Sequence, residues 1–303
     1  AAPGETVVLD GTEPVSGTWQ SFREGIYRVA LDGPVEQLFV DRKMMMEARW
    51  PNSRFEELWV RDKWAHAMSG SRKDLMICKV LPATGIDWTG AVAALNIGPQ
   101  YCSFARVVTK HETGSDRFEY ELKQRMHDGK DDGPGWANDR FYLFGKLEAL
   151  DVPGEWYHDA AAKQLYLRCE DDRPPTGRIV EYKRRDLGFE LRKCQYVQLH
   201  GFRFFGDTFV LNDCHHCLVE NCQLLFPTFS RMLDDVGPKD ARHSIPTTSV
   251  RGDHNTIRKV SVGFSNTRGI LVRGRHNVVE NCIVHDANWV GAFSYAGILA
   301  TGR

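Results

Sequence analysis

The chain has 303 residues, enough for one large domain or two, and 42% of them are apolar and 26% charged. Its formal net charge is −1 at pH 7, so it lacks the basic excess that a nucleic-acid-binding surface requires. No apolar run approaches the 18 or more residues of a membrane span. We therefore expect a globular protein with no nucleic-acid partner and no membrane span.

The first segment predicts secretion and short strands. The chain starts with Ala-Ala-Pro, which suits a mature end left after removal of a signal peptide. We expect an extracellular or periplasmic protein on this ground. Residues 5–50 then alternate apolar and polar residues in the runs TVVLD, GIYRVAL and QLFVDRKMMMEARW, which is typical of short strands.

Residues 51–180 carry strand-like runs at irregular spacing, such as DLMICKVL, SFARVVTKH and RFYLFGKL. Clusters of Gly, Pro and Asp divide these runs, and proline and glycine at 173–178 close the segment. Antiparallel strands separated by such turn residues favour a β-sandwich. We place this sandwich at 53–177.

Three carboxylates lie around one turn of that segment. Pro153-Gly154 suits the two central positions of a type II turn, and Asp151, Glu155 and Asp159 flank it. Carboxylates can serve acid–base catalysis, but these three stand between two strands of the expected sandwich. We interpret them as structural.

Residues 196–303 repeat one strand pattern. Four stretches align: YVQLHGFRFFG (196–206), LVENCQLLF (218–226), NTIRKVSVGF (255–264) and NVVENCIVHD (277–286). One column of this alignment holds Leu199, Val219, Ile257 and Val279, and another holds Phe204, Leu224, Val262 and Val284. The first column advances by 20, 38 and 22 residues, which is about one coil per step with one insertion. Such repetition with a strand period predicts a solenoid of stacked coils, a parallel β-helix.

A second repeated strand precedes each of the later stretches. It stacks Val250 on Val272 and Gly252 on Gly274 and Gly302, and it brings Asp253 beside Arg275. His254-Asn255 recurs as His276-Asn277, and we expect the asparagines to take the left-handed turn conformation at the coil corner. The domain prediction is thus a β-helix start at 1–52, an inserted sandwich at 53–177 and coils at 178–303.

The eight cysteines do not form the dense framework of a small secreted domain. Cys222 and Cys282 share a column two coils apart, about 10 Å, which is too far for a disulfide. Cys214-His-His-Cys217 has the spacing of half a zinc site, but no second half follows. We interpret it as a coil corner and expect no metal and no cofactor.

Two runs carry a family resemblance: QLFVDRKMMMEARWPN (37–52) and FYLFGKLEALDVPGEWYHDAAAKQLYL (141–167), followed by the coils. Together they resemble the secreted right-handed parallel β-helix proteins of carbohydrate breakdown. The chain is most similar to glycoside hydrolases that embed a β-sandwich in a β-helix, a group with β-xylosidase and α-L-fucosidase members. The resemblance implies an all-β fold of this architecture and a carbohydrate substrate. Members are usually longer, with acidic catalytic residues on central or later coils, so we expect this chain to be a fragment or truncated form.

Two insertions interrupt the coils, at 227–246 and at 285–297. Both follow the same strand column, so they should emerge on one side of the solenoid, where loops carry function. We predict Asp286, Asp234 and Asp235 as catalytic carboxylates and His285, Trp289, Tyr295, Arg231 and His243 as substrate-binding residues. The aromatic rings would pack on the C–H faces of a sugar and exclude water from one carboxyl.

Asp286 is the leading catalytic candidate. It stands where the aligned stretches carry Phe226 and Phe264, so a carboxylate has replaced a packing residue. A glycoside hydrolase needs a second carboxylate, roughly 5 Å away for a retaining mechanism or roughly 6.5–9.5 Å for an inverting one. Asp234 or Asp235 is the expected partner.

Two other functions stay open at this point. A polysaccharide lyase acting on a uronate polymer would use a base and a cation, for which Arg231, Lys239, Arg242 and His243 are available. A non-catalytic glycan-binding solenoid would need only the aromatic groove. The oligomeric state is not predicted.

Overall fold

The computed structural model describes residues 5–58, 60–97, 103–121, 139–231, 247–289 and 296–302. In this part of the chain the regular structure is strand, with four short 3-10 helices: η1 (Phe55–Glu57), η2 (Arg61–Lys63), η3 (Leu81–Thr84) and η4 (Leu147–Ala149). The predicted all-β class is confirmed. No helix among the described residues is long and apolar enough to cross a membrane.

The chain divides into two compact units. One, here called the coil unit, comprises Ala1–Glu13, Lys183–Ser230 and Arg242–Arg303. The other, the sheet unit, comprises Pro14–Tyr182 and Arg231–Ala241.

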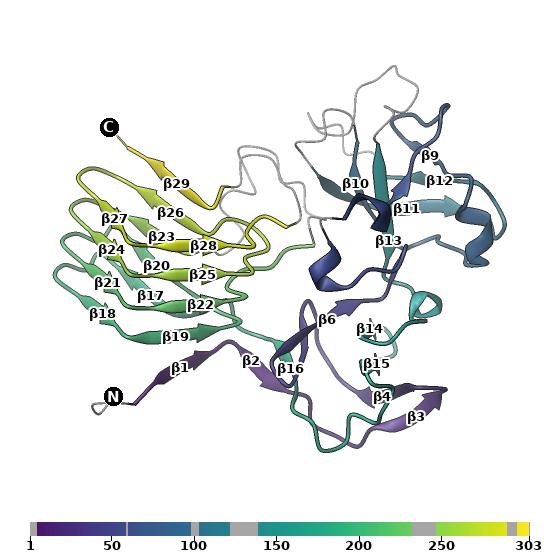
Figure 1. The fold of residues 1–303 in the computed structure, drawn as a ribbon, viewed down its shortest axis with the longest axis horizontal. Coiled ribbons are helices and arrows are strands. Elements are labelled where there is room, and N and C mark those ends of the chain that lie inside the picture. The colour runs from purple at the N-terminus through teal and green to yellow at the C-terminus, as the bar shows by residue number, and fades with distance from the viewer. Residues whose placement is uncertain are drawn as a thin grey trace. The chain divides into compact units, whose positions relative to one another are not determined.

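The coil unit consists of three sheets whose described strands all pair in parallel (Figure 1). The first contains β1 (Val7–Asp10), β19 (Phe202–Phe205), β22 (Gln223–Leu225), β25 (Ser261–Gly263) and β28 (Ile283–His285). The second contains β17 (Leu187–Arg192), β20 (Thr208–Asn212), β23 (Ser249–Arg251), β26 (Ile270–Arg273) and β29 (Ile298–Thr301). The third contains β18 (Gln198–His200), β21 (Leu218–Glu220), β24 (Thr256–Arg258) and β27 (Val278–Glu280). Successive strands of each sheet lie one above another, so the chain returns to the same position once per coil.

The register of these sheets confirms the sequence columns. Leu199 pairs with Val219, which pairs with Ile257, which pairs with Val279. The column from Phe204 to Val284 is paired in the same way. Most of these side chains are buried in one apolar core that runs along the coil, as burial of an alternating strand face requires. Val279 is only half-buried, because β27 is the last strand of its sheet among the described residues.

The coil corner at 254–255 corrects one expectation. The left-handed conformation belongs to His254 (φ 59°) and His276 (φ 56°), and not to the asparagines that follow them. Asn255 is buried: its Oδ1 accepts the Cys217 N–H at 3.0 Å, and its Nδ2 donates to the Cys214 carbonyl at 2.8 Å. The asparagine therefore satisfies backbone groups inside the corner, while the histidine makes the turn.

The histidines at this corner form an exposed ladder. The rings of Tyr196, His216, His254 and His276 stack with centroid distances of 5.1, 4.8 and 4.7 Å. Cys214 and Cys217 flank His216 in sequence, and both thiols are buried in the coil core. Asp253 contacts Arg275 through the backbone, because its carboxylate accepts the Arg275 N–H at 2.8 Å.

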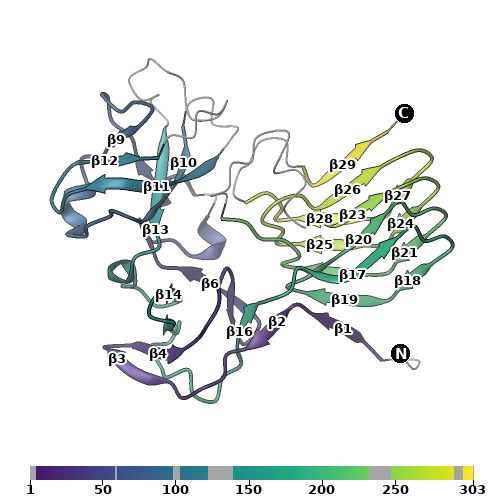
Figure 2. The ribbon, with the colours of Figure 1, turned by 180° about the vertical axis from the view of Figure 1, so that it is seen from behind.

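The sheet unit contains one antiparallel sheet and one mixed sheet, which Figure 2 shows from behind. The antiparallel sheet runs β7 (Arg49–Trp50), β13 (Arg140–Phe144), β10 (Val92–Asn96), β11 (Phe104–His111), β12 (Arg117–Tyr120) and β9 (Leu75–Ile77), with β8 (Ala65–His66) beside β13. The mixed sheet runs β2 (Thr12–Pro14), β16 (Val180–Lys183), β5 (Leu38–Val40), β6 (Lys43–Glu47), β14 (Glu155–Asp159), β15 (Gln164–Arg168), β4 (Ile26–Ala30) and β3 (Gln20–Arg23). Of the strands in residues 5–50, β1 pairs in the coil unit and β3 to β6 pair in the sheet unit.

Large aromatic residues fill the sheet-unit interior. Trp88 and Phe141 lie in a core under the antiparallel sheet, and Trp156 lies in a second core under the mixed sheet. The Trp156 indole N–H donates to the Met45 carbonyl at 3.1 Å, which satisfies its polar edge. The parallel pairing of β6 with β14 places Met46 beside Glu155 and Glu47 beside Trp156.

Candidate functional site

The coil unit presents His285 and Asp286 as a pair. His285 ends β28, and its Nδ1 lies 2.7 Å from Oδ2 of Asp286. Both side chains are about half exposed, at 46% and 49%. The imidazole packs edge-on against Phe264, with ring centroids 5.3 Å apart. A carboxylate thus stands at the end of a strand, held by a neighbouring imidazole and open to a ligand.

The backbone accounts for part of the exchange of phenylalanine for aspartate. Phe226 (φ 53°), Phe264 (φ 58°) and Asp286 (φ 49°) all take the left-handed conformation. Aspartate is favoured there over most residues with a side chain, so the exchange relieves backbone strain. Phe226 and Phe264 stack on each other at 5.0 Å, and the His285 ring, whose residue pairs with Gly263, lies edge-on against Phe264.

Trp289 packs on the coil unit a few residues further on. Its ring lies 5.9 Å from that of Phe229, and the N–H of Asn288 donates to the carbonyls of Ser265 and Thr267. An aromatic residue is therefore fixed on the rung that follows β28. The other predicted residues of these loops, Asp234, Asp235, His243 and Tyr295, lie outside the described residues.

Arg231 lies in the sheet unit, where it forms an ion pair with Glu47. Its guanidinium also lies 5.8 Å from the centre of the Phe144 ring. The Glu47 side chain is 13% exposed, and its burial raises the pKa to about 7 against the opposing charge of Arg231. Such a carboxyl can exchange a proton near neutral pH, as acid–base catalysis requires.

Glu47 was missed by the sequence analysis. It follows three methionines in the run KMMMEARW, which the sequence indicates only as a strand and as part of the family resemblance. A single carboxylate beside an apolar strand run was the available signal. Its ion-pair partner is 184 residues away, so the pair itself could not be inferred.

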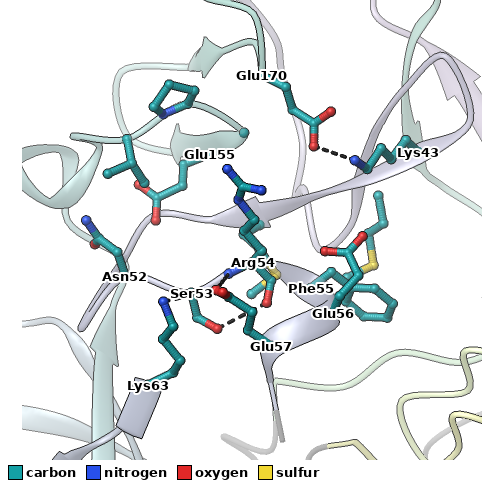
Figure 3. A pocket seen from close by; sticks show the side chains of 15 residues that line it. Lys43, Asn52, Ser53, Arg54, Phe55, Glu56, Glu57, Lys63, Glu155 and Glu170 are labelled. Carbon is teal, nitrogen blue, oxygen red and sulfur yellow. Dashed lines mark hydrogen bonds and ion pairs between the residues drawn. The ribbon is translucent and has the colours of Figure 1, made fainter. Parts of the chain in front are cut away.

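The sheet unit also contains a polar pocket of about 630 Å³ (Figure 3). Its walls come from β6, from the segment around η1 and from the turn before β14. The lining residues are Lys43, Met44, Met46, Asn52, Ser53, Arg54, Phe55, Glu56, Glu57, Lys63, Val152, Pro153, Gly154, Glu155 and Glu170. This volume lies within the roughly 300–1,000 Å³ usual for small-molecule sites.

Two ion pairs join charged residues that line the pocket. Lys43 lies 2.6 Å from Glu170, and Lys63 lies 3.2 Å from Glu57. The Glu57 carboxylate also accepts the Arg54 backbone N–H at 3.1 Å, which lowers the pKa of Glu57 together with its contact to Lys63. Both lysines of the lining are therefore paired with glutamates of the same lining.

Glu155 differs from the other carboxylates of the turn at 150–159. Its side chain is 1% exposed, and one oxygen accepts the Arg49 backbone N–H at 3.4 Å. Its Oε2 has no partner of good geometry among the described residues, while the backbone N–H groups of Asp151 and Val152 lie close enough to the carboxyl to favour its ionised form. Burial, together with the nearby Asp151 carboxylate, raises the pKa of Glu155 to about 8. The group is therefore a neutral acid at pH 7.

Among the described residues, no group of three or more His, Cys, Asp or Glu side chains is arranged to hold a metal ion. The described cysteines are all free thiols. The chemistry available in this part of the chain is that of carboxyl groups, imidazoles and cationic side chains.

No protein-family model and no curated protein matches the chain by sequence. A solved structure titled "Glycoside hydrolase" is similar over 94% of this chain and 53% of its own, with 16% identity and a TM-score of 0.58. Another, titled "The complex structure of XylC with xylose", is similar over 99% of this chain and 46% of its own, with 12% identity and a TM-score of 0.45. The chain spans about half the length of these proteins. The likeness to the first is one of fold.

Proposed function

We propose that this chain belongs to a glycoside hydrolase that acts on plant or microbial polysaccharides or oligosaccharides by a two-carboxylate mechanism. The observation that carries the proposal is the fold shared, over 94% of the chain, with the protein titled "Glycoside hydrolase". In this proposal the coil unit is a right-handed parallel β-helix and the inserted segment is a β-sandwich.

Asp286 is the proposed catalytic carboxylate. The end of a rigid strand fixes a side chain better than a loop tip does, and β28 ends one residue before Asp286. The contact with His285 at 2.7 Å orients the carboxylate, and the other oxygen stays available to a sugar carbon or to a water molecule. Asp234 or Asp235 is the proposed second carboxyl, which would protonate the leaving oxygen.

The test is a panel of aryl glycosides, with release of the phenol measured in one channel. Ultraviolet absorption of unsaturated uronate products is measured in a second channel on polymer substrates. A hydrolase gives the first signal and a lyase gives the second. Absence of both signals contradicts an enzymatic function.

The site assignment is tested by Asp286→Asn. We expect kcat to fall by about a thousandfold, the usual scale for loss of a catalytic proton donor or acceptor. Asp213→Asn is the matched control, because Asp213 also has a left-handed backbone (φ 56°) and lies 3.5 Å from a histidine, His215. A folded Asp286→Asn protein with the turnover of the control would remove Asp286 from the mechanism.

A further inference from the structure

Two arginines lie directly opposite each other on the second sheet of the coil unit. Arg251 ends β23 and Arg273 ends β26, and the two residues are paired in register. Figure 1 shows the two strands as neighbours in the stack. The arginine side chains point away from the coil core, because Val250 and Val272, the residues before them, point into it. The two guanidinium groups therefore emerge on the outer face of the sheet from strands about 4.8 Å apart.

Neither arginine has a counterion among the described residues. No carboxylate of this part of the chain lies within ion-pair distance of either guanidinium, and Nε of Arg251 is buried without a hydrogen-bond partner. Burial and the charge of Arg273 lower the pKa of Arg251. On the third sheet, by contrast, Arg258 lies 2.8 Å from Glu220 on the neighbouring strand. The facing arginines repel each other, since like charges directly opposite destabilise a strand pair.

The positions around the pair are neutral. Thr301 on β29 pairs with Arg273 from the following coil, and Asn212 ends β20 at the matching position of the coil before Arg251. Two residues earlier along the strands the same face carries Ser249 and Leu271, which are both buried. No neighbour within this face of the sheet therefore supplies a negative charge to the two arginines.

The carboxylates that follow these strands are engaged elsewhere. Asp213 lies 3.5 Å from a ring nitrogen of His215. Asp253 accepts the Arg275 backbone N–H at 2.8 Å. A ligand can therefore reach the arginine pair without first breaking an ion pair.

The stacked arrangement selects the chemistry of the missing anion. A guanidinium fork binds two oxygens of one anion, and two stacked forks present donors at two levels. A carboxylate carries one charge and two oxygens, so it neutralises one arginine only. A phosphate group carries a charge of about −1.5 to −2 at pH 7 and three acceptor oxygens, so it matches both the charge and the donors of the pair.

We propose that Arg251 and Arg273 bind a phosphate group on the outer face of the coil unit, as inorganic phosphate or as a phosphate monoester. A phosphate between them removes their repulsion and joins two successive coils, so it stabilises the folded coil unit. This site goes beyond the proposed glycoside hydrolysis and does not depend on it, because it rests on the facing arginines and their neutral surroundings.

The experiment titrates protein labelled with ¹⁵N at arginine with inorganic phosphate, and with sodium chloride at equal ionic strength as the reference. Arg192 is the internal control, because it lies on β17 of the same sheet and is already paired with Glu190. We expect phosphate to shift the Nε–H signals of Arg251 and Arg273 with saturation and to leave that of Arg192 in place. Chloride should shift none of the three.

Two substitutions remove one fork each. Arg251→Gln and Arg273→Gln should each weaken phosphate binding about tenfold or more, through loss of a charge-assisted contact. Arg192→Gln removes the same charge from the same sheet and should leave binding unchanged. Without phosphate, the two test variants should melt at or above the temperature of the parent, because they lack the repulsion. Phosphate should raise the melting temperature of the parent and leave theirs nearly unchanged.

Glucose 6-phosphate distinguishes the two sources of the phosphate group. Tighter binding than inorganic phosphate supports a monoester, and weaker binding supports the free ion. Acetate that binds as tightly as phosphate would overturn the match to a phosphate group, as would sulfate that binds more than tenfold more tightly. Shifts of every arginine signal without saturation would show a diffuse field and overturn the site. Failure of both test variants to fold would assign the arginines to the scaffold and overturn it too.

Discussion

The coil unit and the sheet unit satisfy their buried polar groups in different ways. In the coil unit the same hydrogen-bonding arrangement recurs from one coil to the next. The backbone N–H and side-chain amide of Asn255 both donate to the side-chain oxygen of Asn277 in the following coil. In the sheet unit each buried charged group has surroundings of its own, such as Arg49, which donates to the carbonyls of Pro51 and Lys63. A repeated polar residue is explained by stacking. The coil unit also contains a buried charged group outside the repeat, since Asp207 is 2% exposed and burial raises its pKa to about 7.

The largest effect is expected where coils approach most closely. An added Cβ at Gly252 would lie 1.9 Å from the Cys214 carbonyl oxygen, and the residue has φ +129°. Gly252→Ala should therefore cost more than about 3 kcal/mol in the free energy of unfolding, or prevent folding, because backbone must move. The measurement is chemical denaturation followed by circular dichroism.

Gly90→Ala is the control in the sheet unit. Gly90 also has positive φ (+83°), but its added Cβ would meet nothing within 4 Å. Its cost should be about 1 kcal/mol, from backbone conformation alone. Equal costs at the two glycines would contradict the close coil contact.

The next effect concerns Asn255 and Asn277, whose side chains are hydrogen-bonded between successive coils and are here called the amide ladder. Asn255→Ala removes the bonds to the Cys217 N–H and the Cys214 carbonyl in a buried corner, and should cost about 2–4 kcal/mol. Asn277→Ala should cost less, since Asn277 is only half-buried and water can replace its bonds. If the two variants unfold at the same denaturant concentration as the parent, the ladder does not hold the corner.

The smallest effect is electrostatic and belongs to the sheet unit. The folded pKa of Glu155, about 8, lies above its ordinary value of 4.5. The stability linked to this group is therefore complete below pH 4.5 and is lost as pH rises toward 8. Glu155→Gln does not titrate, so its advantage over the parent should grow by about 1–3 kcal/mol between pH 5 and 8. Urea denaturation at both pH values measures the difference.

Glu119→Gln is the matched control for this titration. Glu119 is exposed on β12, away from the pocket lining, and its substitution should give no comparable change with pH. An advantage of Glu155→Gln that stays constant from pH 5 to 8 would contradict burial of the carboxyl.

The candidate site was predictable only in part. His285 and Asp286 could be singled out because the aligned positions of the preceding coil carry Gly263 and Phe264. The change to a histidine and an aspartate is visible when the repeated stretches are aligned. Their contact follows from adjacency in sequence. Arg231 was selected as a loop cation, but its partner Glu47 lies in a distant strand, and no local pattern connects them.

The sequence by itself determined the all-β class, the register of the coil columns and the stacking of Gly252 on Gly274. It could do so because each rung returns to the same place after about one coil, and an alternating pattern that repeats at that interval fixes which face is buried. Only the tertiary structure decided which carboxyl groups are buried away from solvent. Glu47 and Glu155 have their pKa values raised by burial, and that burial comes from strands and turns far apart in the chain. The pocket likewise gathers residues 43–63, 152–155 and 170, a grouping set by long-range strand pairing and absent from any local run of residues.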